Sequence, residues 1–247
     1  MSTSPQPESK PSKKIAIVQS NYIPWKGYFD FIDSVDEFVL YDDVQFTRRD
    51  WRNRNKIKTK DGTRWLTIPV QVKGQFLQKV NETQVSNPNW VDEHLATFRH
   101  SYAQAPYFRQ MKDWLQDLYL GSRSFTGLSE INFRFITAIC QHLHISTKLS
   151  WSSGYDLFEG KNERLIHICL QAGATEYVSG PLARDYLDET LFNQYGLKLT
   201  YFDYSGYREY PQLFPPFEHG VSVLDLIMNT GEGAYAYVKK GLADSHD

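Results

Sequence analysis

Two short apolar runs, separated by a helix-like stretch, constrain what this chain of 247 residues can fold into. The first run, residues 15–20, leads into a polar turn that contains Pro24 and Gly27. An amphipathic stretch over residues 27–35 follows, and the second run, residues 38–41, ends in two aspartates. This order of strand, loop, helix and strand is typical of a parallel α/β sheet, and such sheets bind ligands at the carboxyl ends of their strands.

The same rhythm returns later in the chain. Apolar runs predict strands over residues 145–151, 176–179 and 197–202, and helical spacing predicts helices over residues 162–172 and 185–194. Ser222 with Asp225 resembles a capping box and predicts the start of a last helix. Residues 65–72 carry Pro69, which predicts an edge strand.

Three helical segments between about residues 88 and 144 interrupt this alternation. We therefore predict a single α/β domain over residues 15–247. It would contain a three-layer, mostly parallel, Rossmann-like sheet with a helical insertion at about residues 88–144. Residues 1–14 are rich in serine, proline and lysine, and this composition predicts a disordered tail.

Composition narrows the class of protein. The net charge of −2 argues against bulk binding of nucleic acid or of a membrane. Cys140 and Cys169 lie in apolar helical runs, which favours buried, reduced thiols in a cytoplasmic protein. No residue pattern indicates a metal site, a cofactor or a membrane span. The aromatic content of 15% suits a surface for a sugar, a base or a protein, and equally an aromatic-rich core.

The loop after the first apolar run has the residue types of an anion site. A helix that starts at such a loop presents free backbone N–H groups to an anion, and Lys26 adds a positive charge. We predict that the loop binds a phosphate or a carboxylate through Gln19, Asn21, Tyr22, Lys26, Gly27 and Tyr28. The alternative is a tight turn in which Pro24 and Gly27 serve the backbone alone.

Asp42 and Asp43 end the second predicted strand, and Gln45 follows them. Adjacent residues of a strand point to opposite sides, so at most one of the two carboxylates faces a given pocket. That carboxylate would accept a hydrogen bond from a sugar hydroxyl, bind a metal ion or act as a general base. The alternative is a salt bridge from the aspartates to the arginines that follow.

A segment rich in arginine and asparagine comes next. Arginine can bind phosphate and carboxylate groups through two parallel hydrogen bonds, and an aromatic ring can stack on a base or a sugar. We predict substrate-binding roles for Gln45, Arg49, Trp51, Arg52, Asn53, Arg54 and Asn55. Arg184 follows another predicted strand and could reach the same edge of the sheet. The alternatives are a solvated hairpin and, for Arg184, a capped helix start.

Several short segments of the sequence resemble the WbqC-like protein family. They include Ile15-Ala-Ile-Val-Gln19, Phe38-Val-Leu-Tyr-Asp-Asp-Val-Gln-Phe46, Trp51-x-Asn-Arg-Asn55, Trp65-Leu-Thr-Ile-Pro-Val70 and Ser222-Val-Leu-Asp-Leu226. The similarity extends over nearly everything from residue 15 to about residue 231. It implies a bacterial protein of the cytosol that assists the biosynthesis of surface polysaccharides, such as O-antigen, or of modified sugars.

The first loop is also weakly similar to a nucleotidyltransferase signature. In that signature a strand leads through a proline-containing loop to His-x-Gly-His at a helix start. Trp25-Lys26-Gly27-Tyr28 stand at these four positions, so both histidines are missing. Their absence puts adenylyl transfer by the usual route in doubt.

These observations lead to one leading prediction of function and one alternative. The leading prediction is a transferase-type enzyme that acts on a phosphorylated or nucleotide-linked sugar intermediate. Its candidate catalytic residues are Lys26, Tyr28, Asp42 and Asp43. The alternative is a non-catalytic binding or scaffold protein within a biosynthetic complex. Nucleic acid is a less favoured partner, and the sequence leaves open whether the chain forms a homo-oligomer.

Overall fold

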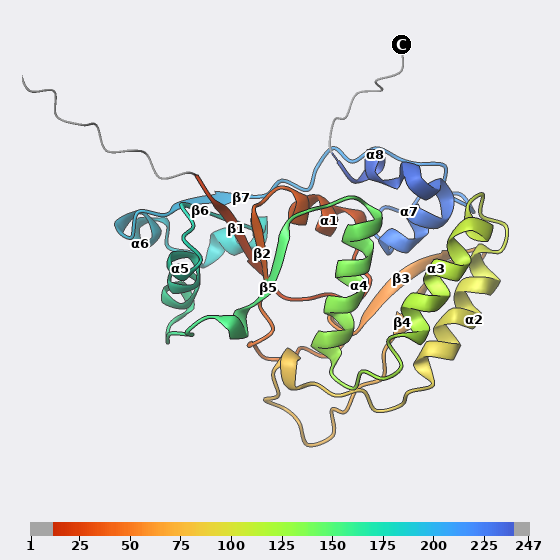
Figure 1. Cartoon of the computed structure of the whole chain (residues 1–247), viewed down its shortest axis with the longest axis horizontal. Helices are drawn as coiled ribbons and strands as arrows, with labels where there is room; N and C mark the ends of the chain where they lie inside the picture. The colour runs from red at the N-terminus through yellow and green to blue at the C-terminus, as the bar shows by residue number, and fades with distance from the viewer. Residues whose placement is uncertain (1–11, 240–247) are drawn as a thin grey trace, which may run out of the picture.

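The computed structural model describes residues 12–239 and is built around five parallel strands (Figure 1). In space the strands follow the order β5-β2-β1-β6-β7. This arrangement confirms the predicted α/β class with a parallel sheet. The strands are β1 (Lys14–Val18), β2 (Glu37–Leu40), β5 (Lys148–Trp151), β6 (Glu176–Ser179) and β7 (Lys198–Tyr201).

The predicted tail falls mainly on residues 1–11, which lie outside the described residues. Lys14 already belongs to β1, so the sheet starts one residue earlier than the apolar pattern indicates. The Lys13 side chain donates to Glu37 at 2.7 Å and thereby ties the strand start to the neighbouring strand.

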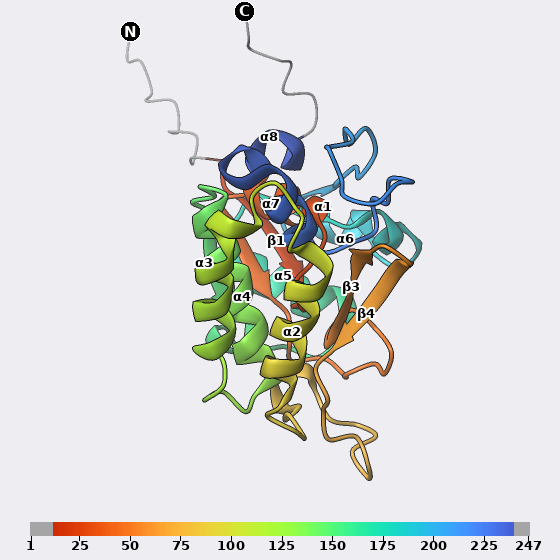
Figure 2. The same ribbon diagram turned by 90° about the vertical axis from the view of Figure 1, so that its right-hand side faces the viewer.

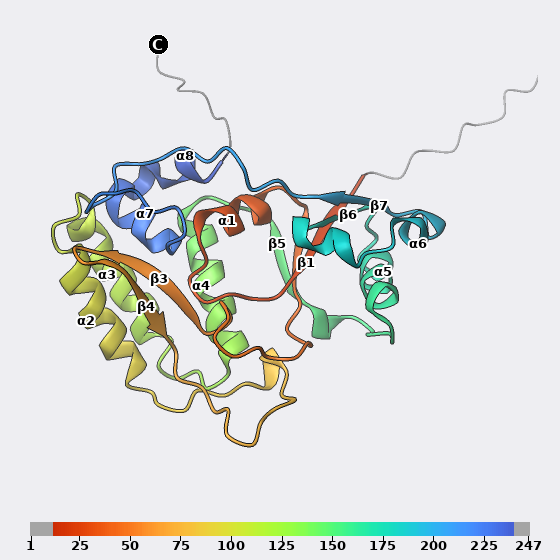
Figure 3. The ribbon, with the colours of Figure 1, turned by 180° about the vertical axis from the view of Figure 1, so that it is seen from behind.

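Helices cover both faces of the sheet, as Figures 1 and 3 show. The side chains of β1 alternate between two apolar cores: Ala16 packs in the larger core, whereas Ile15 and Ile17 pack in the smaller one. The helices of the larger core are α1 (Lys26–Asp33), α2 (Trp90–Tyr102), α3 (Phe108–Leu120), α4 (Leu128–His142), α7 (Val223–Thr230) and α8 (Tyr235–Val238). Those of the smaller core are α5 (Lys161–Gln171) and α6 (Glu189–Gln194).

Between β2 and β5 the chain forms a separate hairpin and the three helices α2, α3 and α4, which Figure 2 shows beside one another. Strands β3 (Arg54–Thr59) and β4 (Gly62–Thr67) pair only with each other. The edge strand predicted over residues 65–72 is therefore right in part, and it belongs to the hairpin. Its first three residues belong to β4, and the segment that contains Pro69 follows the hairpin.

Four short 3-10 helices complete the described chain. They are η1 (Val80–Glu82), η2 (Ser152–Gly154), η3 (Pro181–Asp185) and η4 (Gly231–Ala234). The helix predicted over residues 185–194 is thus too long. Asp188 starts α6 because its carboxylate accepts a hydrogen bond from the backbone of Leu191 at 3.1 Å.

The predicted start of the last helix is right for one of its two polar residues. The Ser222 hydroxyl accepts from the backbone of Leu224 at 3.2 Å and caps α7. Asp225 does not complete a capping box, because the backbone N–H of Ser222 donates to Lys56. The buried Asp225 carboxylate instead accepts hydrogen bonds from the hydroxyls of Tyr102 and Tyr210.

Both cysteines are buried and unpaired, as the sequence predicts. Burial raises the pKa of the Cys140 thiol to about 12, which keeps it protonated near neutral pH. Among residues 12–239, none of the helices has the length and apolar character that crossing a bilayer requires.

Candidate functional site

The carboxyl ends of β1, β2 and β5 lie level with one another. Val18 stands opposite Leu40, and Leu40 stands opposite Trp151. The loops that follow these three strands therefore begin side by side at one edge of the sheet. Strand order reverses at β1, because the chain first adds strands on one side of it and later adds β6 on the other. Such a reversal point is where open α/β sheets bind ligands.

Arg52 holds the loop after β1 in place. Its Nη1 donates to the carbonyls of Gln19 at 3.4 Å and Ser20 at 3.3 Å, and to the Asn21 side chain. Its Nη2 lies 3.4 Å from an oxygen of Asp50. The guanidinium predicted to clamp a substrate is thus engaged largely with the protein itself.

Neighbouring residues of the arginine-rich segment also form hydrogen bonds with the loop after β1. The backbone N–H of Tyr22 donates to the Trp51 carbonyl at 3.0 Å. The Asn55 side-chain amide donates to the carbonyls of Tyr22 at 3.1 Å and Ile23 at 2.9 Å. Ile23 has a φ of 38°, so this amide supports a backbone conformation that is uncommon for a branched residue. Two segments predicted to bind substrate are therefore bound to each other.

We expect Arg52→Ala to lower the free energy of unfolding by about 2 kcal/mol, because three acceptors of a partly buried loop lose their donor. Urea unfolding followed by fluorescence measures the change. Arg49→Ala is the matched control, since the Arg49 side chain is exposed. Equal stability of the two variants would contradict the anchoring role of Arg52.

Tyr22 lies in a buried network rather than at a ligand surface. Its hydroxyl is 2.8 Å from Nδ1 of His94 and 2.6 Å from the hydroxyl of Tyr119. Nε2 of His94 lies 3.2 Å from the Thr67 carbonyl, so the proton belongs on Nε2 and Nδ1 accepts from Tyr22. Burial lowers the pKa of His94 from 6.5 to about 4, which keeps the ring neutral. Tyr22 thus connects the loop to the helical insertion.

Lys26 is buried and engaged with another part of the protein. It is 2% exposed, and its Nζ donates to the carbonyl of Arg208 at 2.5 Å. The rings of Tyr207 and Tyr210 lie 5.5 Å and 5.2 Å from Nζ. Burial lowers the pKa of Lys26 to about 8. We infer that this lysine attaches α1 to the segment before α7.

Gly27 and Tyr28 have structural roles as well. A Cβ on Gly27 would come within 2.3 Å of the Trp25 ring, so glycine allows the indole to fold over the helix start. The buried hydroxyl of Tyr28 donates to the Gln19 carbonyl at 3.0 Å. Burial and the nearby Asp42 raise the pKa of Tyr28 well above its usual value.

The structure distinguishes the two aspartates. Asp42 is buried, and its carboxylate accepts from the backbone of Ser20 at 2.8 Å and from the Ser129 hydroxyl. Asp43 is partly exposed and accepts from the Asn81 amide at 2.9 Å and the Ser152 hydroxyl at 2.5 Å. Asp42 thus supports the loop, whereas Asp43 keeps access to solvent. Both residues lie beyond the end of β2 and both line the pocket described next, so the expectation that at most one of them faces a given pocket is wrong.

A polar pocket of about 370 Å³ lies beside Asp43 at the ends of β2 and β5. Its lining offers carboxylates, hydroxyls and amides, and one exposed aromatic ring. Such groups suit a ligand that carries several hydroxyls, because they can both donate and accept hydrogen bonds while the ring covers an apolar face. The lining residues are Asp42, Asp43, Asn81, Gln84, Gly127, Ser129, Glu130, Trp151, Ser152 and Ser153.

Several residues of this site do not stand out in the sequence. Ser129 and Asn132 come from α4, and Asn132 donates at 2.9 Å both to the Ser20 hydroxyl and to the Arg52 carbonyl. One signal could have found Asn132. It lies four residues after Leu128 and three before Phe135, on the buried stripe of an otherwise apolar helix face. Asn81 lies in η1, and Ser152 and Ser153 lie in η2; these 3-10 helices are too short to give a period in the sequence.

The remaining predicted residues do not line the polar pocket. The Arg54 guanidinium lies 4.0 Å from the Trp65 ring, and Trp65 packs 5.2 Å from Trp51. Asn53 donates to the Ile68 carbonyl at 2.8 Å, and Gln45 donates to that of Phe76 at 2.9 Å.

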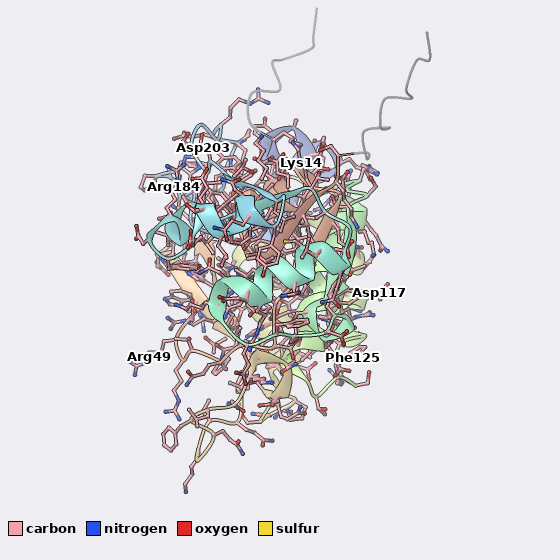
Figure 4. All side chains as sticks on the ribbon, turned by 90° about the vertical axis from the view of Figure 1, so that its left-hand side faces the viewer. Lys14, Arg49, Asp117, Phe125, Arg184 and Asp203 are labelled. Atoms are coloured by element: carbon pink, nitrogen blue, oxygen red, sulfur yellow. The ribbon has the colours of Figure 1, made fainter. Side chains whose placement is uncertain are left out.

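Arg184 does not join the arginine segment. Its guanidinium lies 4.7 Å from the Tyr201 ring. Figure 4 shows Arg184 and Arg49 well apart on the molecule. The structure therefore brings Gln19, Asn21 and Arg52 together with the aspartates, and leaves Arg184 outside this group.

Comparison with known proteins agrees with the family resemblance of the sequence segments given above. A model of the WbqC-like protein family matches residues 19–237. The chain belongs to the WbqC-like protein family. The family match contains the loop after β1, both aspartates and all residues that line the polar pocket.

One relative of this WbqC-like protein is the uncharacterized protein Rv1507c of Mycobacterium tuberculosis. The two are 52% identical over 227 residues, which is 92% of this chain and 98% of the mycobacterial protein. No solved structure matches the chain.

Proposed function

We propose that this WbqC-like protein is a transferase-type enzyme of bacterial surface polysaccharide or modified-sugar biosynthesis. The observation that carries the proposal is the polar pocket beside Asp43, at the carboxyl ends of β2 and β5. Open α/β sheets bind ligands outside the carboxyl ends of their strands. Its volume of about 370 Å³ fits one small molecule. The carboxylates, hydroxyls and amides of its lining favour the hydroxyl-rich part of a sugar.

Asp43 is the residue that we assign to the chemistry. A transferase needs a group that accepts a proton from the attacking hydroxyl, and a positioned carboxylate can do this. The Asn81 amide and the Ser152 hydroxyl orient Asp43, while the side chain keeps access to the pocket. The residues that line this pocket include no lysine or arginine, the side chains that usually bind phosphate. A phosphorylated or nucleotide-linked substrate therefore stays a prediction.

The test is a thermal-shift screen with sugars, sugar phosphates and nucleotide sugars. A ligand at about 100 times its dissociation constant raises the free energy of unfolding by about 3 kcal/mol, so we expect a shift of several degrees. We expect Asp43→Asn to abolish the shift because the carboxylate accepts the substrate hydroxyl. Asp61→Asn, at an exposed turn, should leave it unchanged. A shift of equal size in Asp43→Asn would contradict the assigned site.

A non-catalytic binding protein is the second candidate. Trp51 and Trp65 are each about two-fifths exposed and pack together on the hairpin, which gives an aromatic surface that suits a protein partner. If no small molecule shifts the melting temperature, a pull-down with the wild type and with Trp51→Ala tests this candidate.

A further inference from the structure

Residues 71–79 form a loop that projects from the rest of the molecule (Figures 1 and 2). Two adjacent apolar side chains lie in this loop. Phe76 is 72% exposed and Leu77 is 83% exposed. A soluble surface commonly tolerates a single apolar residue, but two large ones in sequence at the tip of a projecting loop suggest a partner that accepts them.

Hydrogen bonds fix the shape of this loop. Gln45 donates to the Phe76 carbonyl at 2.9 Å, and the backbone of Phe46 donates to the Gln78 carbonyl at 2.9 Å. The Gln78 side chain in turn donates to Gln71 at 2.8 Å. These bonds fix the turn and hold both apolar side chains toward solvent. Less conformational entropy is therefore lost when the loop binds a partner.

The charges within the loop and the segment that faces it are all positive, although Asp43, Asp50 and Glu82 flank these segments. The two facing segments, residues 44–49 and 71–79, contain Arg48, Arg49, Lys73 and Lys79 but no aspartate or glutamate. All four cationic residues are exposed. The two segments together carry a charge of +4, although the net charge of the whole chain is −2.

A hollow of about 460 Å³ lies between the two segments. Its lining consists of Gln45, Phe46, Thr47, Arg48, Gln75 and Phe76. The Arg48 guanidinium donates to the Val72 carbonyl at 2.6 Å and lies 5.6 Å from the Phe76 ring. The hollow thus places donors for an anion directly behind the apolar tip.

We propose that residues 44–49 and 71–79 form a contact for the surface of an anionic membrane. Phe76 and Leu77 enter the boundary between headgroups and acyl chains, while Arg48 and the nearby cations bind headgroup phosphates. Neither signal is strong alone, and stable attachment to a membrane needs two such signals together. The proposal does not depend on the proposed function. Asn81 of the polar pocket lies two residues after the end of the contact.

Co-sedimentation of the full chain with vesicles tests the proposal. The vesicles contain phosphatidylcholine alone or with about one third phosphatidylglycerol. We expect binding to the anionic vesicles, weakened by salt because one part of it is electrostatic. Phe76→Ser with Leu77→Ser should weaken it at least tenfold, because both anchors are lost. Lys73→Glu should weaken it by more than about fivefold, because it reverses one charge near an anionic surface.

Matched controls lie elsewhere on the surface. Leu182→Ser removes an apolar side chain that is 85% exposed, and Lys112→Glu reverses an exposed charge on α3. Neither should change vesicle binding. As a second readout, the tryptophan of Phe76→Trp should shift its emission to the blue on anionic vesicles, since the indole leaves water.

Three results would overturn the proposal. The first is equal binding to both kinds of vesicle, and the second is unchanged binding when Phe76 and Leu77 are both serine. The third is binding of a mixed oligonucleotide, lost in Lys73→Glu, without binding of vesicles, because the cations would then serve nucleic acid.

Discussion

Asp42→Ala is expected to lower the free energy of unfolding by about 4 kcal/mol and the melting temperature by about 10 °C. The buried carboxylate accepts from the backbone of Ser20 at 2.8 Å and from the hydroxyl of Ser129. Its removal leaves two buried donors without an acceptor and breaks one link between α4 and the loop after β1, while the bond from Asn132 to Ser20 remains. Urea unfolding and calorimetry measure both quantities.

The neighbouring aspartate provides the control. Asp43→Ala removes a partly exposed carboxylate and should cost about 1 kcal/mol or less. Asp42→Asn should retain part of the lost stability, because its amide oxygen can still accept from Ser20. If Asp43→Ala were the more destabilising change, the assignment of Asp42 to support and Asp43 to the pocket would be reversed.

Acid is expected to remove about 3 kcal/mol of stability through His94 alone. The pKa of this ring falls from 6.5 to about 4 in the folded protein, so folding favours the neutral form. The contribution is complete above pH 6.5 and is lost as the pH falls from 6.5 toward 4, because the unfolded chain takes up the proton first. Urea unfolding at about pH 7.5 and at about pH 4.5 measures it.

The other titrating groups of the chain also respond to acid, so a variant isolates the part that belongs to His94. His94→Gln does not titrate, and its amide can still donate to the Thr67 carbonyl. Between about pH 7.5 and about pH 4.5, His94→Gln should lose less stability than the wild type. The difference should be most of the about 3 kcal/mol assigned to His94. An equal loss in both proteins would show that another group carries the acid sensitivity.

The main elements of the fold could be predicted because their signals are local. The apolar runs at β1 and β2 and the helical spacing of α2, α3 and α4 each require only a short stretch of sequence. The hairpin could not be predicted in this way. On β3 the inward position of Asn55 is polar, since its amide supports the carbonyls of Tyr22 and Ile23, so the usual alternation of apolar and polar residues is hidden.

The candidate site was predictable in position and less so in the role of each residue. The residues that follow β1 and β2 do meet at one edge of the sheet, as the strand order requires. Residue type alone could not show that Arg52 is bonded to backbone carbonyls, or that Lys26 lies among aromatic rings. Those roles depend on contacts between residues far apart in the chain.

The same long-range contacts determine when the loop after β1 takes its final shape. Its bonds join residues 22 positions apart for Asp42, 32 for Arg52 and 112 for Asn132. Contacts of such separation form slowly, because a long stretch of chain must be ordered before they are gained. During synthesis the loop can therefore take its final shape only after α4 has left the ribosome. A shortened chain that ends before residue 132 would contain the first two strands but would lack the Asn132 amide that bonds to Ser20 and Arg52.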